Sequence, residues 1–197
     1  MKTVATQHTD AHNNTRQFVI DTARHLFSEQ SYLGVSMRDI AKKLNVTKAA
    51  LYYHFTGKEE IYKEVIEQVF NDLRNEIQKA LTETTYNKKM HRLIENYLNF
   101  GLKENNLVKV MTVKLSPNNS AINELVVGLR EKIADQIEPL IKELFLRKKV
   151  IQKVSPRLLT LLLTGMMDGL LLEHSVLGSK IKPGVMANQI TAVLSLE

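Results

Sequence analysis

Apolar residues recur along most of this 197-residue chain at intervals of three and four positions. Val19, Ala23, Leu26 and Phe27 are the first to follow this spacing, which predicts an amphipathic helix because one helical turn takes 3.6 residues. No segment alternates apolar and polar residues in the manner of a half-buried strand. The pattern therefore predicts an all-α fold of about nine helices.

The segment from Ser36 to Phe55 predicts two short helices joined by a tight turn. Ser36 and Asp39 have the spacing of a capping box, although Asp is shorter than the usual Glu or Gln. Asn45 tolerates the left-handed conformation that ends a helix, and Thr47 is a good N-cap for the helix that follows. The apolar residues expected to be buried in this pair are Ile40, Leu44, Val46 and Leu51.

A long helix is expected next, because apolar residues recur every four positions from Ile61 to Leu81. Thr56 and Glu59 have the spacing of a second capping box at its start. The helices expected beyond the tight pair span residues 58–81, 88–105, 106–115, 121–147, 156–176 and 183–197.

The pattern divides the chain into three parts. Residues 1–14 are polar and aperiodic, and we expect them to form a flexible tail. Residues 15–60 hold the first three helices, and residues 61–197 hold the others.

The composition is that of a globular protein, with 44% hydrophobic and 24% charged residues. The chain has no cysteine, which excludes disulfides and thiolate chemistry and fits a cytoplasmic location. The first residues lack an apolar core of signal-peptide length, so secretion is not expected. The apolar run from Leu158 to Leu172 is short and contains Asp168, which favours a buried helix over a membrane span.

Positive charge is concentrated in one short segment. Between Ser36 and Lys58 the chain has five basic residues and one acid, so this segment carries +4 of the net charge of +6. A local basic patch is typical of a protein that binds a polyanion such as nucleic acid. A solvated helix face explains the charge equally well, so the charge alone does not decide between them.

The sequence motif in this segment favours nucleic-acid binding over a solvated helix face. The stretch "GVSMRDIAKKLNVTKAALYYHFTGKEEIY" closely resembles the N-terminal signature of the TetR/AcrR family of bacterial transcription regulators, and the resemblance covers about residues 16–62. Two positions depart from the family pattern: Ser31 and Asn45 stand where many members have Gly. The matching residues are Ser36, Ile40, Ala41, Leu44, Val46, Leu51, Tyr52, His54, Phe55 and Lys58.

The resemblance implies a helix-turn-helix whose second helix enters the major groove of DNA with its N-terminal residues at the base edges. Those residues are Thr47, Lys48, Ala49 and Ala50, and Lys48 is suited to donate to guanine. The residues placed by the resemblance near phosphates or the groove edge are Ser36, Met37, Arg38, Tyr52, Tyr53, His54 and Lys58. Half-buried packing is the alternative for the two tyrosines, and a structural role is the alternative for His54. Phe55 is expected in the core.

The resemblance also implies an effector pocket and a dimer interface within residues 61–197. The candidate lining residues are Tyr97, Phe100, Met111, Val126, Leu129, Arg130, Met166 and Met167, each of which is also compatible with ordinary core packing. Their apolar character suits a small hydrophobic effector. Asp168, Glu173 and His174 are candidates for orienting it, while Asp168 and His174 equally suit the dimer interface. We expect the dimer to form through the last two helices.

The function expected is that of a homodimeric, ligand-responsive repressor that leaves a palindromic double-stranded DNA operator when a small apolar effector binds. No catalytic triad, Gly-rich phosphate loop or clustered carboxylate pair is evident, so an enzyme is not expected, nor is a cofactor or a membrane partner. His8 and His12 are four residues apart, but metal binding in a tail is not expected. A helical small-molecule carrier or interaction protein and an architectural DNA binder without a ligand are the alternatives.

Overall fold

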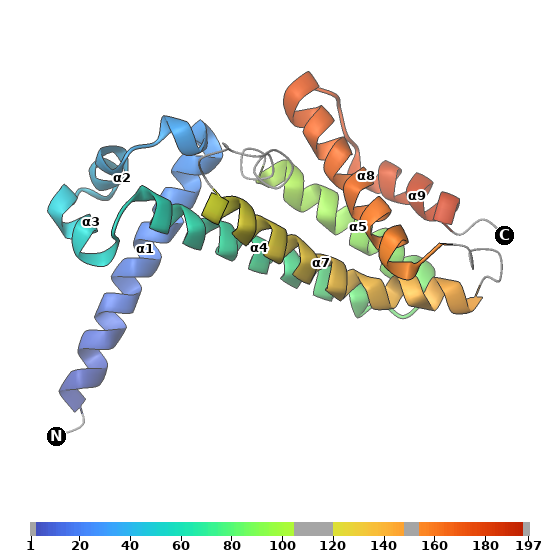
Figure 1. Cartoon of the computed structure of the whole chain (residues 1–197), viewed down its shortest axis with the longest axis horizontal. Coiled ribbons are helices and arrows are strands. Elements are labelled where there is room, and N and C mark those ends of the chain that lie inside the picture. The colour runs from blue at the N-terminus through green and yellow to red at the C-terminus, as the bar shows by residue number, and fades with distance from the viewer. Residues whose placement is uncertain (1–2, 105–119, 148–153, 195–197) are drawn as a thin grey trace. The chain divides into compact units, whose positions relative to one another are not determined.

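The chain forms eight helices in the part that the computed structural model describes, which is residues 3–104, 120–147 and 154–194, with backbone alone for 3–13 and 147. These residues contain no strand, and the all-α fold class is confirmed (Figure 1). The helix expected over 106–115 lies outside the described residues. The helices are α1 (Thr3–Gly34), α2 (Met37–Leu44), α3 (Lys48–His54), α4 (Lys58–Leu81), α5 (Tyr86–Lys103), α7 (Ser120–Arg147), α8 (Pro156–Leu177) and α9 (Pro183–Leu194).

The helices belong to two compact units, Met1–Gln68 and Val69–Glu197. The boundary lies within α4, beyond the boundary expected at residue 60. One continuous helix therefore contributes residues to both units.

The first helix is longer than the apolar pattern indicated. It begins at Thr3, within the stretch expected to be a tail, because no Pro or Gly interrupts it before Gly34. Ser31 is the one non-helical residue inside it, with φ 66° and ψ 171°. This is the position at which the family pattern has Gly.

The caps of the two short helices are confirmed. The Ser36 side chain accepts from the Asp39 N–H, and the Asp39 carboxylate accepts from the Ser36 N–H at 2.8 Å. Asn45 ends α2 in the left-handed conformation, with φ 57° and ψ 40°. Thr47 begins α3 by accepting from the Ala50 N–H at 3.1 Å.

The cap expected before α4 uses a different glutamate. The N–H and hydroxyl of Thr56 both donate to the Glu60 carboxylate, at 2.6 and 2.8 Å, and Glu59 instead pairs with Lys63. Glu60 lies four positions, about one full turn, after Thr56, and its side chain reaches back to Thr56.

The first unit has a small apolar core, but two positions differ from the expectation. Val46 is 44% exposed rather than buried, because the chain reverses at Asn45 and only the Val46 N–H turns back, to bond the Ala41 carbonyl at 3.0 Å. Leu44 is only half-buried. The largest fully buried side chains of this unit are Phe27, Ile40, Leu51, Phe55, Ile61 and Tyr62.

In the second unit, α5 packs against α7, α8 and α9, and α7 packs against α8. The second half of α4 joins them through two backbone carbonyls: that of Glu76 accepts from the Asn96 amide at 3.0 Å, and that of Arg74 accepts from Gln136 at 2.9 Å. The start of α8 at the Ser155 N-cap is confirmed. Among the described helices, none is long and apolar enough to cross a membrane.

Candidate functional site

The N-terminal end of α3 is presented to solvent. Thr47, Lys48, Ala49 and Ala50 are all exposed, and Leu51 is the residue of this helix that is buried. A helix of which one side is held by the core and the other is free has the geometry needed to enter a DNA groove.

The aromatic residues that follow lie on the same surface. Tyr53 is 77% exposed and Tyr52 is 48% exposed, so neither phenol is packed into the core of this unit. The Lys48 ammonium lies 5.6 Å from the centre of the Tyr52 ring, and the rings of Tyr53 and His54 meet edge to face at 5.1 Å. His54 is half-buried. These side chains form an exposed surface of hydroxyl, imidazole and ammonium groups.

The residues at the start of α2 differ in how far their side chains are exposed to solvent. Ser36 and Arg38 are exposed, as are Lys42 and Lys43 further along the helix. Met37 is only 7% exposed, so its side chain packs into the core, and its place near the phosphate backbone stays a prediction. Met37 faces the core because it precedes the buried Ile40 by three positions, which places both on one side of the helix.

Lys58 already has a partner in this structure. Its ammonium donates to the Tyr32 carbonyl at 3.0 Å and lies 4.2 Å from the centre of the Tyr32 ring. Burial lowers the pKa of this ammonium. A contact of Lys58 with a phosphate remains a prediction.

Arg16 connects α1 to the end of α3 and to α4. Its guanidinium donates to the Glu60 carboxylate at 2.8 Å and also to Glu64 and the His54 carbonyl. It lies 4.2 Å from the centre of the Phe55 ring. The bond from Arg16, followed by that from the Thr56 N–H, lowers the pKa of Glu60 to about 2. No local sequence pattern singles out this arginine, because its partners are 38 to 48 positions away along the chain.

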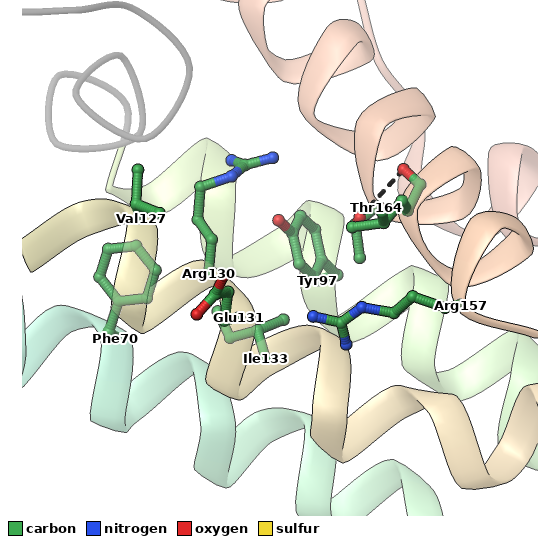
Figure 2. Close-up of a pocket in the computed structure, with 9 residues that line it drawn as sticks. Phe70, Tyr97, Val127, Arg130, Glu131, Ile133, Arg157 and Thr164 are labelled. Carbon is green, nitrogen blue, oxygen red and sulfur yellow. Dashed lines mark hydrogen bonds between the residues drawn. The ribbon is translucent and has the colours of Figure 1, made fainter. Parts of the chain in front are cut away.

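The second unit contains a cavity of about 200 Å³ (Figure 2). Of the residues expected to line a pocket, Tyr97 and Arg130 line this cavity. Val126, Leu129 and Met167 are buried elsewhere in the core, Phe100 is half-buried, and Met166 is exposed on α8. Met111 lies outside the described residues. The lining residues are Phe70, Tyr97, Val127, Arg130, Glu131, Ile133, Arg157, Leu161 and Thr164.

A buried polar cluster adjoins the cavity. The Asp168 carboxylate, 4% exposed, accepts from the Tyr97 hydroxyl at 2.6 Å and pairs with the Arg130 guanidinium at 2.6 Å. Burial, with Asp168 as the next cause, raises the pKa of Tyr97 well above its ordinary value, so the phenol is a neutral donor near pH 7. His174 and Glu173 instead contact Ser179 beyond the end of α8.

Arg157 is a cavity residue that the apolar pattern could not identify. It extends from α8 toward α7, where it pairs with Asp135 at 2.7 Å and Glu138 at 3.5 Å. Within the described residues, no group of three metal-ligating side chains comes together. The side chains of His8 and His12 lie outside that part.

Comparison with known proteins agrees with the motif. Residues 19–65 match the family described as bacterial regulatory proteins of the tetR family. The chain is 51% identical over 53 residues to the biofilm operon icaADBC HTH-type negative transcriptional regulator IcaR of Staphylococcus epidermidis. This match covers 27% of the chain and 29% of that relative. The IcaR of Staphylococcus aureus is 43% identical over 68 residues, which cover 34% of the chain and 37% of the relative.

Solved structures share the fold over nearly the whole chain. The fatty acid degradation regulator FadR from Bacillus halodurans has a TM-score of 0.77 and 17% identity, covering 92% of this chain and 96% of that one. FadR from Bacillus subtilis, solved in complex with stearoyl-CoA, has a TM-score of 0.73 and 17% identity, covering 90% and 96%. The matched family and relatives are transcriptional regulators rather than enzymes. The helix-turn-helix segment of this chain, residues 19–65, therefore belongs to the TetR family of bacterial regulatory proteins.

Proposed function

We propose that the chain is a homodimeric repressor that binds a palindromic DNA operator and is released from it by a small-molecule effector. The exposed N-terminal end of α3, held by the Asn45 turn and the Thr47 cap, is the observation that carries the proposal. Repression in particular is supported by the similarity to IcaR, which is named a negative regulator.

The exposed residues of α2 and α3 have distinct roles in this proposal. Lys48 and its neighbours Thr47, Ala49 and Ala50 contact base edges, where a lysine donates to guanine O6 and N7. Arg38 and the groups on Ser36, Tyr52, Tyr53, His54 and Lys58 contact phosphates, which position the protein without reading sequence.

Dimerisation uses the exposed apolar faces of α8 and α9. Leu158, Leu162 and Met166 recur on α8 at helical spacing, and each is more than two-fifths exposed. A Cβ added at Gly165 or Gly169 meets nothing within 4 Å, so this face is unoccupied by the chain's own atoms and allows close approach of another helix. A symmetric dimer places its two recognition helices in successive major grooves roughly 34–36 Å apart.

The effector binds in the cavity of the second unit. Phe70 lines that cavity and belongs to α4, the helix that continues into the first unit. An effector that binds one conformation of α4 more tightly than the other shifts the population toward it, and DNA affinity changes with that population. The FadR structure with stearoyl-CoA supports a ligand-responsive regulator of this fold.

The test is selection of DNA from a random library by the full-length chain, followed by gel shifts on the selected sequence. A palindrome bound in a salt-dependent manner is the expected result. Lys48→Ala should change the preferred base at one position of each half-site, whereas Arg38→Ala should weaken binding to all sequences about equally. Recovery of no preferred sequence would contradict the proposal and favour a small-molecule carrier, for which the cavity is the supporting observation.

A further inference from the structure

The cavity in the second unit has an apolar wall and a cationic wall. Phe70, Val127, Ile133 and Leu161 supply the apolar surface. The guanidinium groups of Arg130 and Arg157 extend from α7 and α8, and in the view of Figure 2 the Tyr97 ring lies between them. Two guanidinium groups beside apolar side chains favour a ligand that has both an anionic group and an apolar body.

The two arginines are held by partners of different strength. Arg130 pairs with Asp168, whose side chain is only 5% exposed, so this arginine is held by an interior carboxylate. Arg157 pairs at 2.7 Å with Asp135, whose side chain is 68% exposed, and at 3.5 Å with Glu138, whose side chain is 20% exposed. Exposed ion pairs contribute little because water and salt screen them, so a carboxylate inside the cavity can replace Asp135 as a partner of Arg157 while Glu138 keeps its longer contact.

The shape of the guanidinium favours an oxyanion. Its parallel N–H groups match two oxygens of a carboxylate or of a phosphate, and such bidentate pairs are among the stronger hydrogen bonds in proteins. Of these two anions the carboxylate is the smaller, so it leaves more of the cavity for an apolar body. A cationic ligand is disfavoured by the same two groups. Glu131, the only acid among the described lining residues, is exposed to solvent.

The volume limits the apolar body. A cavity of about 150 Å³ holds benzene, and this one measures about 200 Å³. A single ring or a short branched chain therefore fits together with a carboxylate.

We infer that the effector is a small monocarboxylate whose carboxylate binds Arg157 and Arg130 and whose ring or short branched chain contacts Phe70, Val127 and Leu161. This inference rests on the proposed function in one respect: the cavity supports the chemical class of the ligand, and the proposed function makes that ligand an effector.

The experiment is isothermal titration calorimetry of the full-length chain near pH 7 with three carboxylates: benzoate, phenylacetate and 4-methylpentanoate. The neutral 2-phenylethanol and the cationic 2-phenylethylamine serve as shape-matched controls for phenylacetate. At least one carboxylate should bind with a Kd of about 1 mM or tighter, and phenylacetate should bind about tenfold or more tightly than either control. No saturable binding by any carboxylate, or equal binding of the alcohol, overturns the inference.

Variants locate the binding to this cavity. Arg157→Gln removes a half-exposed arginine and should keep the melting temperature while weakening carboxylate binding about tenfold or more. Arg92→Gln, which removes an arginine paired with Glu95 outside the cavity, should bind as the wild type does. The double change Arg130→Gln with Asp168→Asn avoids an unpaired buried carboxylate and should also weaken binding. Wild-type affinity in Arg157→Gln and in the double variant overturns the inference.

Gel shifts on the selected DNA separate this inference from the function on which it rests. A chain that binds DNA without ligand but binds none of the carboxylates leaves the proposed function intact and overturns only the ligand class. A chain that binds phenylacetate through Arg157 but binds no DNA supports the ligand class and contradicts the repressor.

Discussion

Two non-glycine residues in the described part of the chain have positive φ, Ser31 inside the last turns of α1 and Asn45 at the end of α2, and they differ in backbone strain. Asn45, at φ 57° and ψ 40°, occupies the left-handed region that asparagine tolerates. Ser31, at φ 66° and ψ 171°, occupies a region open essentially to glycine alone, and a residue held there costs about 1–3 kcal/mol. The backbone at Ser31 is therefore strained because a serine stands where many members of the family have Gly.

Ser31→Gly should stabilise the protein by about 1 kcal/mol, because the relief of backbone strain exceeds the added entropy of glycine in the unfolded chain. Urea unfolding followed by circular dichroism at fixed protein concentration measures the change. Asn45→Gly is the matched control and should change the free energy of unfolding by only a few tenths of a kcal/mol. Equal effects at both positions would show that Ser31 is not strained.

At the scale of elements, Arg16 joins three helices of the first unit. It connects α1 to the C-terminal end of α3 through the His54 carbonyl and to α4 through Glu60. Most of the residues expected to contact DNA lie just before this junction, so we expect Arg16 and Glu60 to affect DNA binding by fixing the orientation of α3.

The Arg16–Glu60 pair should make stability depend on acidity. The pKa of Glu60 is about 2 in the folded chain and 4.5 ordinarily, so its contribution is complete above about pH 5 and is lost as the pH falls toward 2. Glu60→Gln should be less stable than wild type by about 1 kcal/mol at pH 7, with the difference narrowing below pH 4. Urea midpoints between pH 3 and 7 test this.

The neighbouring Glu59→Gln serves as the control, because Glu59 has only an exposed pair with Lys63. It should leave stability nearly unchanged at neutral pH. A larger loss of stability in Glu59→Gln than in Glu60→Gln would contradict the assignment of the stabilising contact to Glu60.

The close packing of α5 on α8 depends on Gly101. A Cβ at this position would lie 2.2 Å from Leu171 Cδ1, and Leu171 is itself buried. Gly101→Ala should therefore destabilise the protein by about 1–3 kcal/mol through overpacking. Gly128→Ala, on α7 with no atom within 4 Å of the added Cβ, should instead stabilise by about 0.5–1 kcal/mol. Thermal unfolding of both variants measures the contrast, and a stabilised Gly101 variant would contradict it.

At the scale of the whole molecule, the proposed dimer is the feature on which operator binding depends. The Leu162 side chain is 57% exposed on the apolar face of α8. A glutamate there would be buried without a partner if a second copy covers that face.

Leu162→Glu should shift the chain from dimer to monomer and weaken binding to a palindrome by about tenfold or more. Light scattering coupled to gel filtration gives the mass, and a gel shift gives the affinity. Leu146→Glu makes the same chemical change at an exposed position of α7 and should remain dimeric. A dimeric Leu162 variant would exclude this face as the interface.

Local interactions explain what could be predicted from the sequence. The capping box at Ser36, the left-handed Asn45, the Thr47 cap and the start of α8 each depend on residues within four positions, so the residue types alone determine them. The helical spacing of apolar residues likewise identified the helices and most of the core.

Tertiary structure decided which buried or polar side chains meet. The partners of Arg16 lie 38 to 48 positions away, and Tyr97 and Asp168 are 71 positions apart. Periodicity shows that a residue faces inward, but it does not show whether the residue lines a cavity or packs in the core. The pattern therefore predicts Leu129 as a lining residue and does not predict Arg157. The sequence by itself determined the helices and the DNA-binding motif because these depend on local contacts. Only the fold determined the cavity and its charges, because they arise where distant helices pack.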